Sequence, residues 1–288
     1  MISQKKKIIS IALFVIMASV IAIGSKIMLP SEVNAEDFDS LFVRVLGFEV
    51  VASLYFIMIY AHNAVITLFF GQKSELPNNQ AGLRFGICFA LIYLFGMQEV
   101  VVEASPFTSW GTDFIIYQFF MGAGEAIAAV LLCTMIAKFV MAKKNSQQRN
   151  TLLSFRQKVL AVLLIAAAFT AVRIIGYEAG IMHSNANTLP IPTYLWTAIF
   201  GIVLGVCHAV LYPIFKSGEN AVNQSVKIMI LSVGLCWILF NLFIGLIFAG
   251  AMTDMLLRSG LDVLAVFLAS VIWGKYIRRP NINSDSIN

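Results

Sequence analysis

Long apolar runs alternate with short polar segments along the whole chain. A helix needs about 20 apolar residues to cross roughly 30 Å of hydrocarbon. Eight runs are long enough, so the pattern predicts an all-α, polytopic membrane protein with a single transmembrane domain over residues 1–288. The expected spans are approximately 8–28, 42–70, 84–104, 114–141, 158–179, 194–215, 227–249 and 253–276, followed by a polar cytoplasmic tail, 277–288.

The composition agrees with a lipid environment. Of the 288 residues, 59% are hydrophobic and only 12% are charged, and the mean hydropathy is +0.85. A soluble domain carries about 25% charged residues, so this chain has too few charges to cover a water-facing surface. Membrane lipids are therefore its expected surroundings. The four cysteines lie inside apolar runs without CxxC spacing, which is typical of small core residues rather than of disulfides or metal ligands.

The distribution of Lys and Arg predicts the orientation, because loops rich in these residues stay cytoplasmic. Most of the 20 basic residues fall at the N-terminus, in alternate loops and in the tail, whereas the other loops are acidic or neutral. Eight spans with both termini cytoplasmic satisfy every loop of a multi-pass protein in the cell membrane. The basic residues on the predicted cytoplasmic side are Lys5, Lys6, Lys7, Lys73, Arg84, Lys138, Lys143, Lys144, Arg149, Arg156, Lys158, Lys216, Lys227, Lys275, Arg278 and Arg279.

The first span has an alternative interpretation as a secretory signal. Three lysines precede an apolar run, and the sequence SEVNA, which ends at Ala35, resembles a small-residue cleavage site. Cleavage there would leave seven helices with the new N-terminus outside. The apolar core of a signal is about 7–15 residues long and this run is about 20, so we expect the first span to remain.

Two pairs of spans carry similar motifs. The fourth and sixth share Gly-x-x-(Glu/His)-Ala, ending at Ala126 and Ala209, and the second and eighth share an Arg followed by Gly-x-(Glu/Asp)-Val. The spans of each pair run in the same direction, so the pattern predicts parallel helical-hairpin repeats related by an axis along the membrane normal. Chance is the alternative, because Gly and Ala are common in membrane helices.

Ionisable residues inside the spans gather mostly at one depth, towards the predicted outer side. Each charged residue at a helix centre costs roughly 2.5 to 3.5 kcal/mol, so such residues persist by pairing, by protonation or by lining water. Three arginines on the outer half have an acid four or five positions away, which predicts some local pairs. The rest predict a polar cavity that opens outward. The candidate pathway residues are Glu125, Glu49, Glu99, Glu103, Arg173, Glu178, His208, Arg44 and Asp262.

Glu125 is the most unusual of these residues, because it lies at the centre of the apolar stretch YQFFMGAGEAIAAVLLC. Its own span has no basic residue within ten positions, so a partner must come from another helix. Without a partner, desolvation favours the neutral acid. We expect Glu125 to face a polar interior shared with Glu49, Glu99, Arg173 and His208. The structural alternative is a protonated carboxyl that hydrogen-bonds across a seam of small residues.

Motifs for soluble catalysis are missing from the sequence. It contains no phosphate-binding loop, dinucleotide fingerprint, GxSxG or HExxH, and its three histidines are far apart. We therefore predict no cofactor, no metal and no nucleic-acid partner, and the sequence leaves open whether the chain has a protein partner.

Three hypotheses for the function remain. The favoured one is a small transporter or permease, with proton coupling through Glu125 and with Arg173 or Arg44 attracting a small polar or anionic solute. A non-catalytic membrane component, such as a sensor, immunity or assembly subunit, is the first alternative. The second is an intramembrane enzyme acting on a lipid-linked substrate, with Glu99 and Glu103 as general acid and base.

Overall fold

A computed structural model describes residues 4–29, 38–102, 111–142, 153–214 and 220–277. The described residues are helical with no strand, and eight helices are long and apolar enough to cross a membrane. The predicted number of spans is therefore confirmed. In chain order the elements are α1 (Gln4–Ile27), α2 (Leu41–Leu46), α3 (Phe48–Lys73), α4 (Asn78–Gly96), α5 (Glu99–Val102), α6 (Gly111–Met135), η3 (Ile136–Val140), α7 (Phe155–Glu178), α8 (Pro190–Leu211), η4 (Tyr212–Ile214), α9 (Ala221–Lys227), η5 (Ile228–Gly234), α10 (Leu235–Ile247) and α11 (Ala251–Ile277).

Several helix ends differ from the predicted ones for local reasons. The second span begins at Phe48 rather than at residue 42, because Gly47 has a φ of +83° and separates α2 from α3. Glycine adopts this left-handed region without steric cost, so it breaks the helix there. The first turn of α7 is fixed by a capping box, in which Ser154 and Gln157 satisfy each other's backbone amides.

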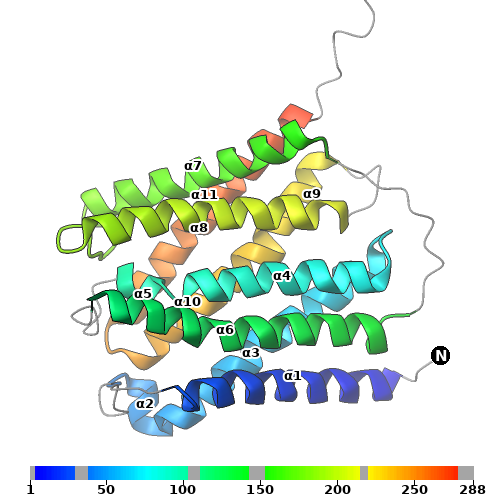
Figure 1. The fold of residues 1–288 in the computed structure, drawn as a ribbon, viewed down its shortest axis with the longest axis horizontal. Helices are drawn as coiled ribbons and strands as arrows, with labels where there is room; N and C mark the ends of the chain where they lie inside the picture. Colours follow the sequence, from blue (N-terminus) through cyan, green and yellow to red (C-terminus); the bar gives the residue numbers. More distant parts are fainter. Residues whose placement is uncertain (1–3, 30–37, 103–110, 143–152, 215–219, 278–288) are drawn as a thin grey trace, which may run out of the picture.

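The helices form two layers (Figure 1). In the front layer α1, α6, α4, α8 and α7 lie side by side, while α3, α10 and α11 cross behind them. The start of α1 and the end of α11 lie at the same end of the bundle. This arrangement agrees with an even number of helices that cross the bundle. The opposite end of the bundle carries α2, α5 and the turn between α7 and α8.

Small residues bring the front helices together in pairs. In α4, Gly82 and Gly86 lie against the backbone of α6, and in α8 Gly201 and Gly205 lie against the backbone of α7. A Cβ atom at Gly205 would lie 2.6 Å from the Cα of Val162, so only glycine permits this approach. These contacts produce two tight hairpins, α4–α6 and α7–α8, that meet where α4 packs on α8.

The first helix is the least buried of the eight. Only 22% of its most apolar window is buried inside the protein, compared with 61% for residues 78–102. It packs mainly on α6 and α3 at the edge of the front layer. α1 is therefore a peripheral helix, whereas α4, α8 and α10 supply most of the interior.

Candidate functional site

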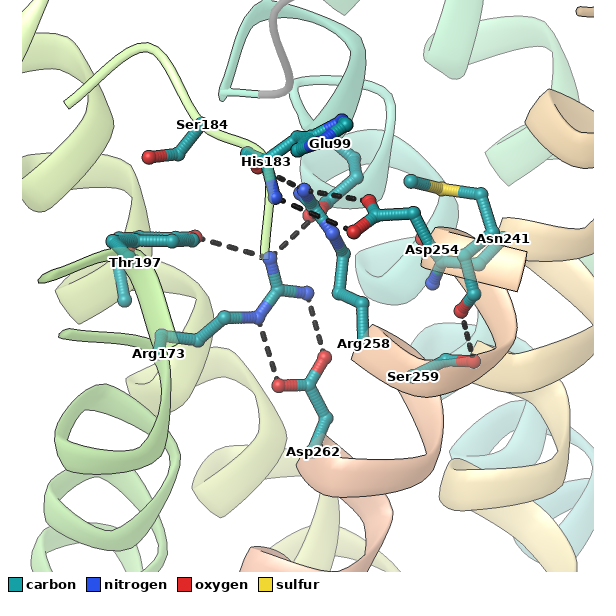
Figure 2. A network of polar contacts seen from close by, with 12 residues as sticks. Glu99, Arg173, His183, Ser184, Thr197, Asn241, Asp254, Arg258, Ser259 and Asp262 are labelled. Atoms are coloured by element: carbon teal, nitrogen blue, oxygen red, sulfur yellow. Dashed lines mark hydrogen bonds and ion pairs between the residues drawn. The ribbon is translucent and has the colours of Figure 1, made fainter. Parts of the chain in front are cut away.

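Five charged side chains form a cluster near the end of the bundle that the sequence predicts to face outward (Figure 2). They are Glu99, Arg173, Asp254, Arg258 and Asp262, which we call the ion cluster. Local structure places each of them. Helix α4 ends at Gly96, and the short helix α5 begins at Glu99. On α11, Asp254, Arg258 and Asp262 follow one another at i,i+4 spacing, which puts them on one face of the helix.

Arg173 is the central residue of the ion cluster, and its side chain has no exposed surface. Its guanidinium forms a two-pronged contact with Asp262, with Nε–Oδ1 at 2.8 Å and Nη2–Oδ2 at 2.6 Å. The remaining nitrogen, Nη1, donates to Glu99 Oε1 at 2.7 Å and to the Tyr177 hydroxyl at 3.0 Å. Paired geometry of this kind is the strongest that a guanidinium makes with a carboxylate. Arg173 thus joins α7 to both α5 and α11.

Arg258 approaches Glu99 from the other side. Its Nη1 donates to the same Glu99 Oε1 at 2.5 Å, and its Nη2 contacts Asp254 Oδ2 at 3.1 Å and the carbonyl of His183. His183 belongs to the turn between α7 and α8, and its backbone amide donates to Asp254 Oδ1 at 3.3 Å. The indole of Trp237 on α10 donates to Asp262 Oδ2 at 2.8 Å. Four helices and one turn therefore meet at the ion cluster.

The charges and hydrogen bonds of the ion cluster do not balance. Three carboxylates face two guanidiniums, so the cluster carries one net negative charge when all five groups are ionised. Both guanidiniums use the same oxygen of Glu99, while its second oxygen, Oε2, is buried and has no hydrogen-bond partner among the described residues. Arg258 Nε is likewise buried and unpartnered within the described chain. A buried polar atom without a partner costs free energy, so this arrangement is not the best one for stability alone.

Glu125 lies elsewhere, at the contact between α6 and α1. Its Oε1 forms an ion pair with Lys26 Nζ at 2.7 Å, and its Oε2 is buried without a hydrogen-bond partner among the described residues. Gly124 allows this approach, because a Cβ atom there would lie 1.8 Å from the hydroxyl oxygen of Ser25. The prediction that a partner comes from another helix is confirmed. The expectation that Glu125 faces Glu99, Arg173 and His208 is corrected, because its charged partner is Lys26 on the peripheral helix.

His208 is also separate from the ion cluster. It lies in the last turn of α8, towards the end of the bundle where α1 starts, and it is fully buried. Its Nε2 lies 2.6 Å from the hydroxyl oxygen of Ser225 on α9, and its ring packs against Trp273 and Tyr212. These contacts are those of a packed interior histidine at the opposite end of the bundle.

The remaining candidates are not inside the bundle. Arg44 and Glu49 are exposed at the junction of α2 and α3, which corrects the expectation that they face a polar interior. Arg44 and Glu49 lie on either side of the helix break at Gly47. Glu178 is exposed at the end of α7, where it accepts a hydrogen bond from the Tyr194 hydroxyl at 2.5 Å. Glu103 lies outside the described residues.

Of the nine candidates, the structure brings together Glu99, Arg173 and Asp262. The ion cluster also contains two residues that were not among the nine candidates. For Arg258 the sequence predicted only a local pair, and Asp254 was interpreted as an acidic loop residue. The signal for both was the i,i+4 series on α11. The part of the chain that the structure describes contains no group of three His, Cys, Asp or Glu side chains that could hold a metal ion.

Compared with models of known protein families, with curated protein sequences and with solved structures, the chain matches none.

Proposed function

We propose that this chain is a small integral membrane transporter that moves an anionic solute together with a proton. The observation that carries the proposal is the ion cluster, in which two fully buried arginines share one oxygen of Glu99. Guanidinium groups are suited to bind carboxylate or phosphate oxygens in pairs, so they are natural sites for an anionic solute. In the structure the protein's own carboxylates occupy these guanidinium groups.

Stability alone is a poor reason for such a cluster. Each charge in the membrane interior is costly, and a buried ion pair contributes little more stability than well-packed apolar residues of the same volume. Intramembrane ionisable residues therefore mark solute or proton pathways by default. The helix break before Glu99 supports the same view, because transporters commonly build their binding sites from interrupted helices.

Proton coupling follows from the excess of carboxylates. Protonation of one acid in the ion cluster would free a guanidinium for a solute anion, and the Lys26–Glu125 pair offers a second site where a proton can be exchanged for a contact. In this proposal the ion cluster binds the solute, and Glu125 carries a proton along α6.

The membrane placement completes the proposal. The Lys and Arg pattern favours both termini in the cytoplasm, which puts the ion cluster in the outer half of the cell membrane. The hairpins α4–α6 and α7–α8 are compatible with a parallel repeat, in which Glu125 and His208 occupy matching positions.

Proton flux in reconstituted vesicles tests this function. Proteoliposomes loaded with the pH-sensitive dye pyranine are given an external panel of anions: pyruvate, succinate, phosphate and sulfate. We expect at least one anion to acidify the interior faster than in protein-free vesicles, and an Arg173→Gln variant to lose this effect. Equal acidification with and without protein for every anion would argue against proton-coupled transport.

Burial of four of its five residues, all but Asp254, also favours a second candidate, a non-catalytic membrane component that uses the ion cluster as an internal brace. Such a protein would give no solute-dependent flux and would lose only stability in the Arg173 variant. The enzyme hypothesis gains less support, since Glu99 is held between two guanidiniums and is poorly placed to act as a general base.

A further inference from the structure

We infer that Glu99 is an internal substitute for the transported solute, and that the solute is a small monocarboxylate that replaces the Glu99 carboxylate between Arg173 and Arg258. This inference rests on the proposed function and specifies the chemistry of the same site. It predicts that one proton accompanies each solute anion, so that transport is electroneutral.

The contacts of Glu99 are those expected of an exchangeable ligand. A single oxygen, Oε1, accepts from Arg173 at 2.7 Å and from Arg258 at 2.5 Å, and Oε2 is buried without a partner within the described residues. Asp262, by contrast, uses both oxygens and accepts three hydrogen bonds. Glu99 therefore accepts fewer hydrogen bonds than Asp262 and keeps one oxygen unpaired within the described residues, and a free carboxylate could also use the donor left over on Arg258 Nε.

The backbone around Glu99 also differs from that around Asp262. Asp262 lies inside the continuous helix α11, whereas Glu99 begins the four-residue helix α5 beyond the break at Met97 and Gln98. The far end of α5 is tied to the α7–α8 turn by Asn185, whose backbone amide donates to the Val102 carbonyl at 2.8 Å. The same turn contacts Arg258 through the His183 carbonyl. A shift of α5 and this turn as one unit would withdraw Glu99 and uncover Arg258.

The charge count identifies the solute class. Once Glu99 is protonated and withdrawn, two guanidiniums remain against the two carboxylates Asp254 and Asp262. One monoanion then restores the original net charge, whereas a dianion would add a second uncompensated charge in a low-dielectric site. A carboxylate fits best because it replaces a carboxylate, and it is small because the vacated volume is that of one carboxyl group.

Proton binding at Glu99 responds to every charged group that faces it. These groups are Arg173 and the Tyr177 hydroxyl on α7, and Arg258, Asp262 and Asp254 on α11, with the neutral indole of Trp237 on α10 behind them. The neighbouring turn contributes the His183 backbone and the exposed His183 ring. Since both guanidiniums contact the Glu99 carboxylate, a solute anion has to compete with Glu99 for them, and protonation of Glu99 removes the competing charge.

Binding measurements on the purified full-length protein in nanodiscs test the inference, with pyruvate as the probe. Trp196 and Trp237 lie beside Arg173 and Asp262, so intrinsic fluorescence reports on the site. Where Glu99 is ionised in the free protein, we expect the apparent Kd of pyruvate to rise about tenfold per pH unit, the slope for uptake of one proton. Pyruvamide, the neutral analogue, should not bind. An apparent Kd that is the same at pH 5 and pH 8, or tighter binding of succinate or phosphate, would overturn the inference.

A Glu99→Gln variant isolates the role of this side chain, because glutamine resembles the protonated acid. We expect it to bind pyruvate with little pH dependence and at least as tightly as the unmodified protein at low pH. Asp39→Asn is the matched control: Asp39 is exposed at the same end of the bundle and contacts the Ala249 amide, outside the ion cluster. It should keep the full pH slope. A slope unchanged in Glu99→Gln would assign the proton to another group and reject Glu99 as the substitute. If the variant does not fold, the pH slope and analogue selectivity of the unmodified protein still decide.

The two proposals fail in different ways. Pyruvate binding with the expected slope, but no proton flux in vesicles, would support the site and reject transport. Proton flux driven by phosphate or sulfate, without pyruvate binding, would support transport and reject the monocarboxylate.

Discussion

Replacing Arg173 by methionine removes the residue that joins three helices of the ion cluster while roughly keeping its volume. The change deletes four hydrogen bonds: two to Asp262, one to Glu99 and one to Tyr177. Asp262 keeps only the indole of Trp237 as a donor, and Glu99 keeps only Arg258. The variant thus leaves a buried carboxylate without its counter-charge.

The size of the effect follows from that unpaired charge. Breaking a buried ion pair by removing one partner costs about 3–5 kcal/mol, which corresponds to roughly two to three and a half powers of ten in the unfolding equilibrium. Most of this cost belongs to the carboxylate left behind rather than to the lost attraction. Adding Asp262→Asn removes the charge and keeps an oxygen for the Trp237 indole. We therefore expect the double variant to recover more than half of the loss.

Equilibrium unfolding in mixed detergent–SDS micelles, followed by circular dichroism, measures the free energy of unfolding of the unmodified protein, of Arg173→Met and of the double variant. Arg44→Met is the control, because Arg44 is exposed, and it should change the free energy of unfolding by no more than about 0.5 kcal/mol. If Arg173→Met is as stable as the unmodified protein, the Arg173–Asp262 ion pair does not contribute to stability. A double variant less stable than Arg173→Met would show that Asp262 is stabilised by something other than Arg173.

Three further predictions concern other parts of the bundle. Gly205→Ala should destabilise the protein by about 1–3 kcal/mol, because its Cβ meets the backbone of α7, whereas Gly260→Ala, with nothing within 4 Å, should not; thermal unfolding of both compares them. A membrane-impermeant thiol reagent applied to intact cells should label Asn187→Cys but not Asn223→Cys, since both positions are exposed, at opposite ends of the bundle, and all four native cysteines are buried; the reverse pattern would invert the topology. Glu125→Gln should abolish solute-driven proton flux in vesicles while the protein still folds, and full flux would remove its role as proton carrier.

The number of helices was predictable because the length and hydropathy of each apolar run are enough to identify a membrane-spanning helix. This criterion uses only the residues of the run itself and no contacts with other helices. The ends were less predictable where one backbone position decides them. At Gly47 the left-handed φ, which the apolar pattern does not encode, moves the start of the second long helix from residue 42 to Phe48. Arg44 and Glu49, on either side of this break, are exposed.

Part of the candidate site was predictable for the same reason. Glu99, Arg173 and Asp262 were all expected at similar depths in their spans, and their side chains do contact one another. Local spacing was a weaker guide. Arg258 does contact Asp254 four positions away, but Arg173 pairs with acids 74 and 89 positions distant instead of with nearby Glu178. A side chain buried on one face of a helix pairs with whatever that face meets, and sequence spacing does not reveal it.

Glu125 illustrates what depth alone leaves out. Its position at the centre of an apolar helix required a partner on another helix, and that inference held. The partner, Lys26, is the second-to-last residue of α1, a position where lysine is normally interpreted as an interfacial anchor. The lysine can act as a partner because α1 crosses α6 where Gly124 leaves room, so the pair depends on which helices are neighbours. Residues of one depth therefore divide into two sites, the ion cluster on α5, α7 and α11 and the Lys26–Glu125 pair on α1 and α6. Any coupling between solute and proton has to link these two sites, and Gln98, which precedes Glu99 and donates to the Ile115 carbonyl of α6 at 3.1 Å, joins them directly.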